Sequence, residues 1–217
     1  MNSFLTSFPW FSMLLWILMP VGASATPPDS LAAGAGNLRW DFSVAGFCYV
    51  LPDDDDIVML VAKADRDNLH LEARYNYEDL RTASVFSGWT FSSGEAFTID
   101  LTPMAGVALG RTAGVVPALE ASLGYGEFDF YLESEYLVDI RETSGSFFYS
   151  WLELGVAPHG MLRAGLVAQR TRVAQTPLEI SRGLFAQLTP DLGSVSVYAL
   201  NLFTESWLLV VGLEISW

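Results

Sequence analysis

The sequence from Trp40 onward consists of segments of roughly ten residues in which apolar and polar side chains alternate, separated by short polar turns. The clearest segment is 69–77, where every second residue from Leu69 is apolar or aromatic. The residues between them are His70, Glu72, Arg74 and Asn76. An alternation of period two places the two sets on opposite faces of an extended strand. The pattern therefore predicts an all-β protein whose sheet has one apolar and one more polar face.

We count about twelve such segments, with ten as the alternative, because 81–91 and 195–203 alternate poorly. The predicted strands are 40–51, 57–64, 69–77, 81–91, 97–109, 115–125, 128–139, 146–156, 161–172, 178–188, 195–203 and 207–217. Pro103 and Pro117 lie inside two of them. Since proline cannot donate to a sheet ladder, we expect a bulge or a displaced strand end at each.

Composition narrows the fold class. The chain is 51% hydrophobic and has positive mean hydropathy, but after its first segment it contains no run of apolar residues long enough for a membrane-spanning helix. Only 17% of its residues are charged, which is low for a soluble domain of this hydrophobicity. A closed antiparallel transmembrane β-barrel, apolar outside and polar in its lumen, accounts for both observations. Short turns are predicted on both sides.

The last segment ends on an aromatic residue and is apolar at every second position before it: Leu209, Val211, Leu213, Ile215 and Trp217. This segment resembles the C-terminal signature strand of bacterial outer-membrane β-barrel proteins. The resemblance implies an outer-membrane location, recognition of these residues by the barrel-assembly machinery, and contact with membrane lipid and lipopolysaccharide. If the chain enters the barrel from the periplasm, an even number of strands also places Trp217 on the periplasmic side.

The N-terminus has the layout of a cleaved secretory signal peptide. An apolar stretch, 4–21, is followed by Ala23, Ser24 and Ala25, which resemble a cleavage site. We predict a signal peptide over 1–25, a short linker over 26–38 and the barrel over 39–217. A retained transmembrane anchor is the alternative, although the segment is slightly short and has no flanking charges.

The alternation that sends apolar residues to lipid predicts a charged, mainly acidic lumen. The lumen-lining candidates are His70, Glu72, Arg74, Asp100, Glu120, Asp129, Glu133, Glu135, Glu153, Arg163 and Glu214. In a water-filled pore these carboxylates would favour cations. Alternatively, they pair with Arg74, Arg163, Tyr131 and Tyr149 in a network that plugs the barrel.

Aromatic residues near the predicted strand ends suggest two interfacial girdles. One set belongs to the periplasmic side: Trp40, Phe97, Tyr125, Phe128 and Trp217. The other set belongs to the outer side: Tyr75, Tyr77 and Trp207.

Several functions are disfavoured. Nucleic acid binding needs clustered Lys and Arg, but the chain has 25 acidic and 11 basic residues. A single cysteine, Cys48, allows no intrachain disulfide. The run 53–56 lacks the glycine and terminal glutamate of an EF-hand loop, so a solvated turn is predicted there. We expect no metal site and no cofactor.

Catalysis is also not predicted. His70 and His159 stand outside the His-x-Ser pattern of outer-membrane phospholipases and the Asp-His pair of outer-membrane proteases. We interpret His70 as part of a satisfied lumenal cluster and place His159 in a turn.

Three functions remain open. The leading hypothesis is a narrow porin-like channel for small solutes with a preference for cations, monomeric or weakly oligomeric. The second is a plugged structural barrel of the cell envelope. The third is a soluble periplasmic lipid-binding barrel, which requires the apolar faces to point inward.

Overall fold

The computed structural model describes residues 39–52, 55–173 and 178–217. They form one antiparallel sheet of strand segments with a single 3-10 turn, η1 (Thr143–Gly145). The segments are β1 (Asp41–Val50), β2 (Ile57–Arg66), β3 (Leu69–Tyr75), β4 (Thr82–Trp89), β5 (Phe91–Ser93), β6 (Phe97–Gly110), β7 (Gly114–Tyr125), β8 (Phe128–Asp139), β9 (Phe147–His159), β10 (Leu162–Val173), β11 (Glu179–Leu188), β12 (Gly193–Leu200) and β13 (Leu208–Ser216).

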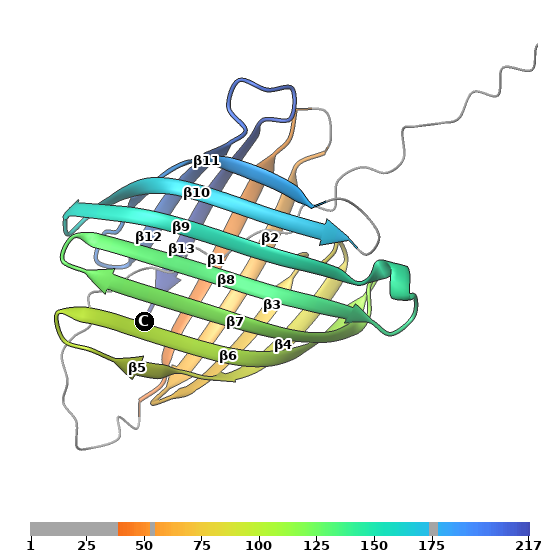
Figure 1. Ribbon diagram of the computed structural model, residues 1–217. Helices are drawn as coiled ribbons and strands as arrows, with labels where there is room; N and C mark the ends of the chain where they lie inside the picture. The colour runs from red at the N-terminus through yellow and green to blue at the C-terminus, as the bar shows by residue number, and fades with distance from the viewer. Residues whose placement is uncertain (1–38, 53–54, 174–177) are drawn as a thin grey trace, which may run out of the picture.

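The sheet closes on itself (Figure 1). Neighbouring strands pair antiparallel, β1 pairs with β13, and β4 pairs with β6. Segments β4 and β5 act as one strand interrupted at Thr90, because Gly88 pairs with Met104 and Phe91 with Leu101 in the same register. The fold is thus the closed twelve-strand barrel that the alternation predicts.

The two prolines interrupt ladders without shifting them. Pro103 of β6 lies at the position where β4 ends and β5 begins, so its missing N–H coincides with the break at Thr90. Pro117 lies in β7 at a gap in the pairing with β8, between Val115 and Ala118. The register is the same on both sides of each gap, so neither the expected bulge nor a displaced strand end is present.

The outer face of the barrel is apolar. Along β11, for example, Ile180, Leu184 and Leu188 are exposed, while Phe185 and Gln187 point inward and are buried. Cys48 lies on the outer face of β1 and is half-buried. No helix within the described part of the chain is long and apolar enough to cross a membrane.

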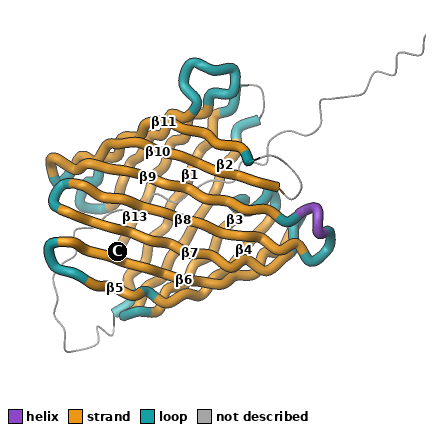
Figure 2. Tube along the Cα trace, in the orientation of Figure 1, coloured by secondary structure: helices purple, strands orange, loops and turns teal. Residues whose placement is uncertain are grey.

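Two predicted strands end earlier than the alternation indicates. Strand β3 stops at Tyr75, because Asn76 adopts a positive φ of 59° and turns the chain. Tyr77 therefore lies inside the barrel, fully buried, and its assignment to an outward-facing girdle is wrong. Strand β12 begins at Gly193 and ends at Leu200, and residues 201–207 form a loop that extends from the barrel in Figure 2.

The other girdle residues lie on the outer surface. Tyr75 and Trp207 are 46% and 39% exposed at one end of the barrel. At the other end Phe97, Tyr125, Phe128 and Trp217 are exposed, and Trp40 is half-buried. Trp40 and Trp217 both stack on Phe42.

We call the end of the barrel at which β13 finishes the C-terminal rim, and the end that carries Asn76, η1 and the 201–207 loop the opposite rim. Asp55 and Asp56 are exposed at the opposite rim, and the rest of the predicted acidic turn lies outside the described residues. The predicted signal peptide and linker also lie outside them.

Glycines on the inner face allow aromatic rings to lie flat against the wall. A Cβ atom at Gly106 would overlap the ring of Phe86 on the neighbouring strand, and one at Gly212 would overlap the ring of Phe47. Gly155 is similarly covered, by Asp129 and Arg163. Side chains in the lumen thus pack directly against the backbone at these glycines.

Candidate functional site

All eleven predicted lumen residues lie on the inner side of the strand alternation. Seven of them are buried: His70, Glu72, Arg74, Glu133, Glu135, Glu153 and Arg163. The other four, Asp100, Glu120, Asp129 and Glu214, are partly exposed. The structure gathers most of them into two clusters, each organised by one arginine.

The first cluster surrounds Arg74 of β3. Its guanidinium forms two hydrogen bonds with Glu72, through Nε at 2.9 Å and one terminal nitrogen at 3.1 Å. It reaches across the lumen to β8, where it contacts Glu135 at 2.8 Å and Glu133 at 3.1 Å. Glu78 is 3.8 Å away. One cation is therefore shared by four carboxyl groups, and every side chain in these pairs has 0% exposure.

Aromatic rings enclose this cluster. The Arg74 guanidinium lies 4.2 Å from the ring centre of Tyr77 and 4.3 Å from that of Phe86. The Tyr77 hydroxyl donates to Glu133 at 2.6 Å. Cation–π contacts and a charge-assisted hydrogen bond stabilise the cluster, whose charged side chains have 0% exposure.

Glu78 belongs to the turn between β3 and β4 and accepts a hydrogen bond from Ser84 at 2.6 Å. Burial raises the pKa of its carboxyl above the usual value, because the charged form loses its hydration. Burial likewise raises the pKa of the neighbouring Asp79, whose carboxylate accepts from Thr112 at 2.5 Å.

The second cluster surrounds Arg163 of β10. Its Nε lies 2.9 Å from Asp129, a terminal nitrogen binds Glu153, and its guanidinium lies 4.5 Å from the ring centre of Phe185. Trp151 donates from Nε1 to the other oxygen of Glu153 at 2.9 Å. This cluster is less enclosed, because the Asp129 side chain remains 15% exposed.

Large side chains fill the lumen between these clusters and towards the opposite rim. The fully buried ones include Trp151, Tyr49, Tyr77, Tyr149, Tyr198, Met59, Leu137 and Leu200. Trp151 and Tyr198 make an edge contact at 5.2 Å between ring centres, and Tyr77 makes one with Tyr149 at 6.3 Å. We refer to these residues, with the Arg74 cluster, as the packed layer.

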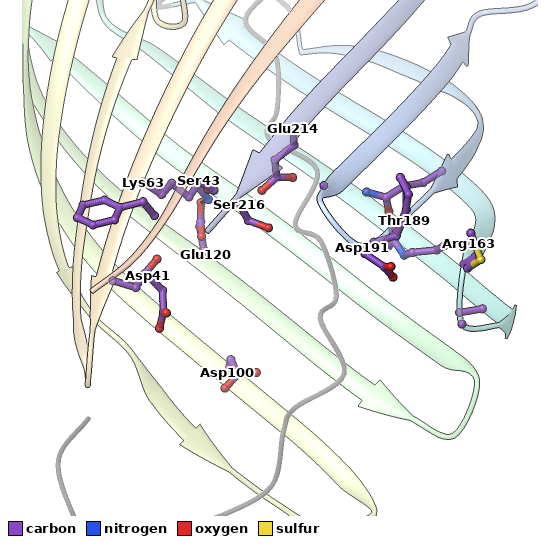
Figure 3. Close-up of a pocket in the computed structure, with 18 of the residues that line it drawn as sticks. Asp41, Ser43, Lys63, Asp100, Glu120, Arg163, Thr189, Asp191, Glu214 and Ser216 are labelled. Carbon is purple, nitrogen blue, oxygen red and sulfur yellow. Dashed lines mark hydrogen bonds and ion pairs between the residues drawn. The ribbon is translucent and has the colours of Figure 1, made fainter. Parts of the chain in front are cut away.

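The lumen at the C-terminal rim is open. A cavity of about 750 Å³, which we call the vestibule, is lined by Asp191 in a rim turn and by strand residues that include Glu120, Arg163 and Glu214 (Figure 3). Gly160, His70 and Asp65 also line it. Its carboxyl groups are Asp41, Asp65, Asp100, Glu120, Asp191 and Glu214. Lys63 and Arg163 are its lysine and arginine, and both are paired with carboxylates.

In Figure 3 the side chains of Lys63 and Glu120 lie side by side, and Arg163 lies near Asp191. Lys63 Nζ lies 2.8 Å from Glu120 Oε1 and joins β2 to β7 across the lumen. Beside this pair, His70 Nδ1 lies 2.7 Å from Asp65 Oδ1, and His70 Nε2 lies 3.5 Å from Glu72. His70 is thus held between carboxylates, and His159 ends β9 at the rim.

Most of the packed layer is not predicted from the sequence. Tyr49, Trp151 and Tyr198 face inward without having been expected there, and the expected pairing of Tyr149 with a carboxylate is not observed. In 45–49 both strand faces are apolar or small, so alternation alone identifies no lumen side there. The signal that could have found these residues is the presence of aromatic residues at the same parity as Glu153 on β9: Phe147, Tyr149 and Trp151.

No family model matches the chain, and no curated protein matches it in sequence. Among solved structures it is similar to the KdgM porin, with a TM-score of 0.62 and 12% identity over 81% of this chain and 99% of that one. A structure of the KdgM porin in complex with disordered oligogalacturonate matches with a TM-score of 0.62 and 11% identity, over the same shares. The outer membrane protein OpdK from Pseudomonas aeruginosa matches with a TM-score of only 0.43 and 13% identity, over 81% of this chain and 67% of that one. At these identities the likeness to KdgM shows the fold, a closed antiparallel barrel.

Proposed function

We propose that this protein is an outer-membrane porin-like channel for small solutes, with a preference for cations. The observation that carries the proposal is a closed barrel with an apolar outer face and a charged lumen, hollowed into an acidic vestibule at one end. The KdgM structures that share this fold are porins, which favours transport over the other functions considered.

The preference for cations follows from the charge of the vestibule. Among the described residues, six carboxyl groups line it, against one lysine and one arginine that are both already paired. A low-dielectric wall focuses this field into the cavity and raises the local concentration of cations. In this proposal the vestibule collects solutes and the packed layer is the narrowest part of the pathway.

Planar-bilayer recordings of the purified, folded protein test the proposal. We expect discrete conductance steps and, in a salt gradient, a reversal potential that indicates cation preference. Neutralising the exposed rim carboxylates with Asp41→Asn and Asp191→Asn reduces that preference and leaves the packed layer intact. Absence of any conductance, or a preference for anions, contradicts the proposal.

One observation favours a second candidate, a structural barrel without transport: the packed layer is fully buried across the lumen. The substitution Trp151→Ala distinguishes the two. It removes a large side chain from the layer, so a channel narrowed at this point increases its conductance, whereas a structural barrel only loses stability. The soluble lipid-binding barrel is not supported, because the carboxylates point inward and the apolar residues outward.

The location and assembly partners belong to the same proposal. Leu213 and Ile215 on the outer face of β13, and Trp217 just after it, are 58–61% exposed, which leaves their side chains accessible to membrane lipid and to the barrel-assembly machinery. Leu209 and Val211 are half-buried on the same face. We propose a monomer or weak oligomer without enzymatic activity, exported by a signal peptide and in contact with lipopolysaccharide. Replacing Trp217 with Ser tests the assembly signal, since it should lower the amount of folded barrel recovered from outer membranes.

A further inference from the structure

Three potential metal ligands meet at the inner end of the vestibule. His70 and Glu72 come from β3 and Glu120 from β7, and one ligand atom of each lies within 4.8 Å of the others. Strands β4 and β6 separate β3 from β7 in the barrel wall, so only closure of the barrel brings the three together. His70 and Glu120 line the cavity, which provides a route from the rim.

The His70 ring is oriented for metal binding. Its Nδ1 lies 2.7 Å from Asp65 Oδ1, and its Nε2 has no hydrogen-bond partner within the described parts of the chain although the residue is only 4% exposed. A proton on Nδ1 donated to Asp65 leaves the Nε2 lone pair directed at the Glu72 side. Metal-bound histidines are commonly held by a carboxylate on the other ring nitrogen in this way.

The spacing suits a small ion. Tetrahedral zinc with bonds of about 2.1 Å separates its ligand atoms by about 3.4 Å. His70 Nε2 and Glu72 Oε2 are 3.5 Å apart. The Glu120 carboxylate needs to move by roughly an ångström to complete the set, and the cavity has room for water as a fourth ligand. Glu72 Oε1 accepts from Arg74 Nε at 2.9 Å and Oε2 from an Arg74 terminal nitrogen at 3.1 Å. Oε2 would therefore bind the ion through its second lone pair, while Nε keeps Oε1 in place.

The local charge also favours a cation. Lys63 and Arg74 are the lysine and arginine in contact with this group, and Arg74 is already shared with Glu78, Glu133 and Glu135. The carboxyl groups of β3, β7 and β8 therefore outnumber the cations that face them. A divalent ion would offset part of this excess in a region of low dielectric constant.

We propose that His70 Nε2 and the carboxylates of Glu72 and Glu120 bind a divalent transition-metal ion, with Zn²⁺ the best match, at the inner end of the vestibule. An imidazole combined with two carboxylates suits zinc, whereas Ca²⁺ and Mg²⁺ take oxygen ligands. No metal site is expected from the sequence, and Glu120, which lies 48 residues beyond Glu72, joins the other two ligands only in the folded barrel.

Titration calorimetry with ZnCl₂ on the folded protein in detergent, in a buffer that does not chelate zinc, tests this site. We expect one zinc ion per barrel, little heat with MgCl₂, and a visible absorption spectrum of tetrahedral Co²⁺ when cobalt is used instead. No bilayer is involved, so the result is independent of whether the barrel conducts. If the wild-type protein binds no zinc, His70 only bridges Asp65 and Glu72 and the proposal is wrong.

Three substitutions locate the ion. His70→Gln removes the nitrogen ligand and should abolish binding. Asp65→Asn changes only the residue that orients His70, and it should not impair folding because the Asp65 side chain is 46% exposed. It should weaken zinc binding by about 10–100-fold. Asp191→Asn removes another vestibule carboxylate and should leave binding unchanged. Equal loss of binding in Asp65→Asn and Asp191→Asn would indicate diffuse attraction to an acidic cavity and would overturn the proposal. Gel mobility before and after heating verifies that each variant is folded.

Discussion

The two ends of this barrel use the same kinds of side chain for different purposes. Towards the opposite rim, Arg74 and its four carboxyl groups are sealed between aromatic rings. Towards the C-terminal rim, Lys63, Glu120 and Asp65 line the vestibule, a cavity of about 750 Å³ that opens at the rim. The arginine of the second cluster, Arg163, lies at the boundary between them, buried but lining the cavity.

The difference shows what decides the role of a lumenal charge. In the packed layer a charge is costly unless it is paired, since a buried ion loses its hydration. In the vestibule the same charge keeps contact with water and is available to solutes or ions. The two halves should therefore respond differently to substitution, the first in stability and the second in selectivity.

Arg74→Met should have the largest effect and tests most directly whether the packed layer depends on charge pairing for its stability. Removing the cation leaves four buried carboxyl groups without their shared partner, which should cost about 3–5 kcal/mol in the free energy of unfolding. Denaturant titration of the folded protein in detergent measures this loss. Arg74→Lys keeps the charge but cannot form the two hydrogen bonds to Glu72, so its stability should lie between that of the wild type and that of Arg74→Met. The vestibule control, Asp191→Asn, should stay within about 0.5 kcal/mol of the wild type. Equal stability of Arg74→Met and Asp191→Asn would contradict the distinction between the halves.

Arg163→Met tests whether the second cluster lies between the packed layer and the vestibule or belongs to the packed layer. We expect a smaller loss of stability, about 2–3 kcal/mol, because Asp129 retains contact with water after its partner is removed. The same substitution removes a positive charge from the vestibule wall and should increase the preference for cations in bilayer recordings. If stability falls as far as in Arg74→Met, the second cluster belongs to the packed layer instead.

A matched pair of tyrosines separates hydrogen bonding from packing inside the layer. Tyr77 and Tyr149 are both fully buried and contact each other, but only the Tyr77 hydroxyl donates to a carboxylate, that of Glu133. Tyr149 has no hydrogen-bond partner for its hydroxyl among the described residues. Tyr77→Phe should therefore cost about 1–2 kcal/mol, while Tyr149→Phe should be neutral or slightly stabilising. Thermal unfolding followed by gel mobility measures both, and a reversed order would show that the hydroxyl of Tyr149 has a role we do not identify.

The smallest expected effect is a change in pH dependence at Glu78. Burial raises the pKa of its carboxyl in the folded protein above the value in the unfolded chain. As pH rises through the unfolded value towards the folded one, the unfolded state loses its proton first, so this group makes stability fall with increasing pH. Glu78→Gln should remove that decline, while its amide oxygen can still accept from Ser84. Unfolding midpoints in mildly acidic and mildly alkaline buffers compare the two proteins. If the stability of Glu78→Gln declines with pH as steeply as that of the wild type, Glu78 is not the group responsible.

Much of the fold could be predicted from alternation alone, because a closed sheet has one lipid-facing and one lumen-facing side. Strand 128–139 of the prediction coincides with β8, and the even strand number is correct. The errors occur where backbone conformation changes the parity of the chain. At Asn76 a positive φ turns Tyr77 inward, and no hydrophobic pattern reports such a turn.

The side-chain clusters were less predictable. The inward direction of Arg74 and Glu72 follows from their spacing, but the contacts of Arg74 with Glu133 and Glu135 depend on which strands face each other across the lumen. The same is true of Lys63 with Glu120 and of the proposed zinc ligands. Turn residues such as Glu78 obey no strand parity, so their burial could not be inferred.

The absence of a side chain at Gly106 affects the position of a buried charge. Because it has no side chain, the ring of Phe86 can lie against the wall and still cover the guanidinium of Arg74. A single methyl group added there, as in Gly106→Ala, would push the ring towards the lumen and displace the cation that four acidic groups share. A purely steric change in the barrel wall would thus be felt as an electrostatic one at the centre of the molecule.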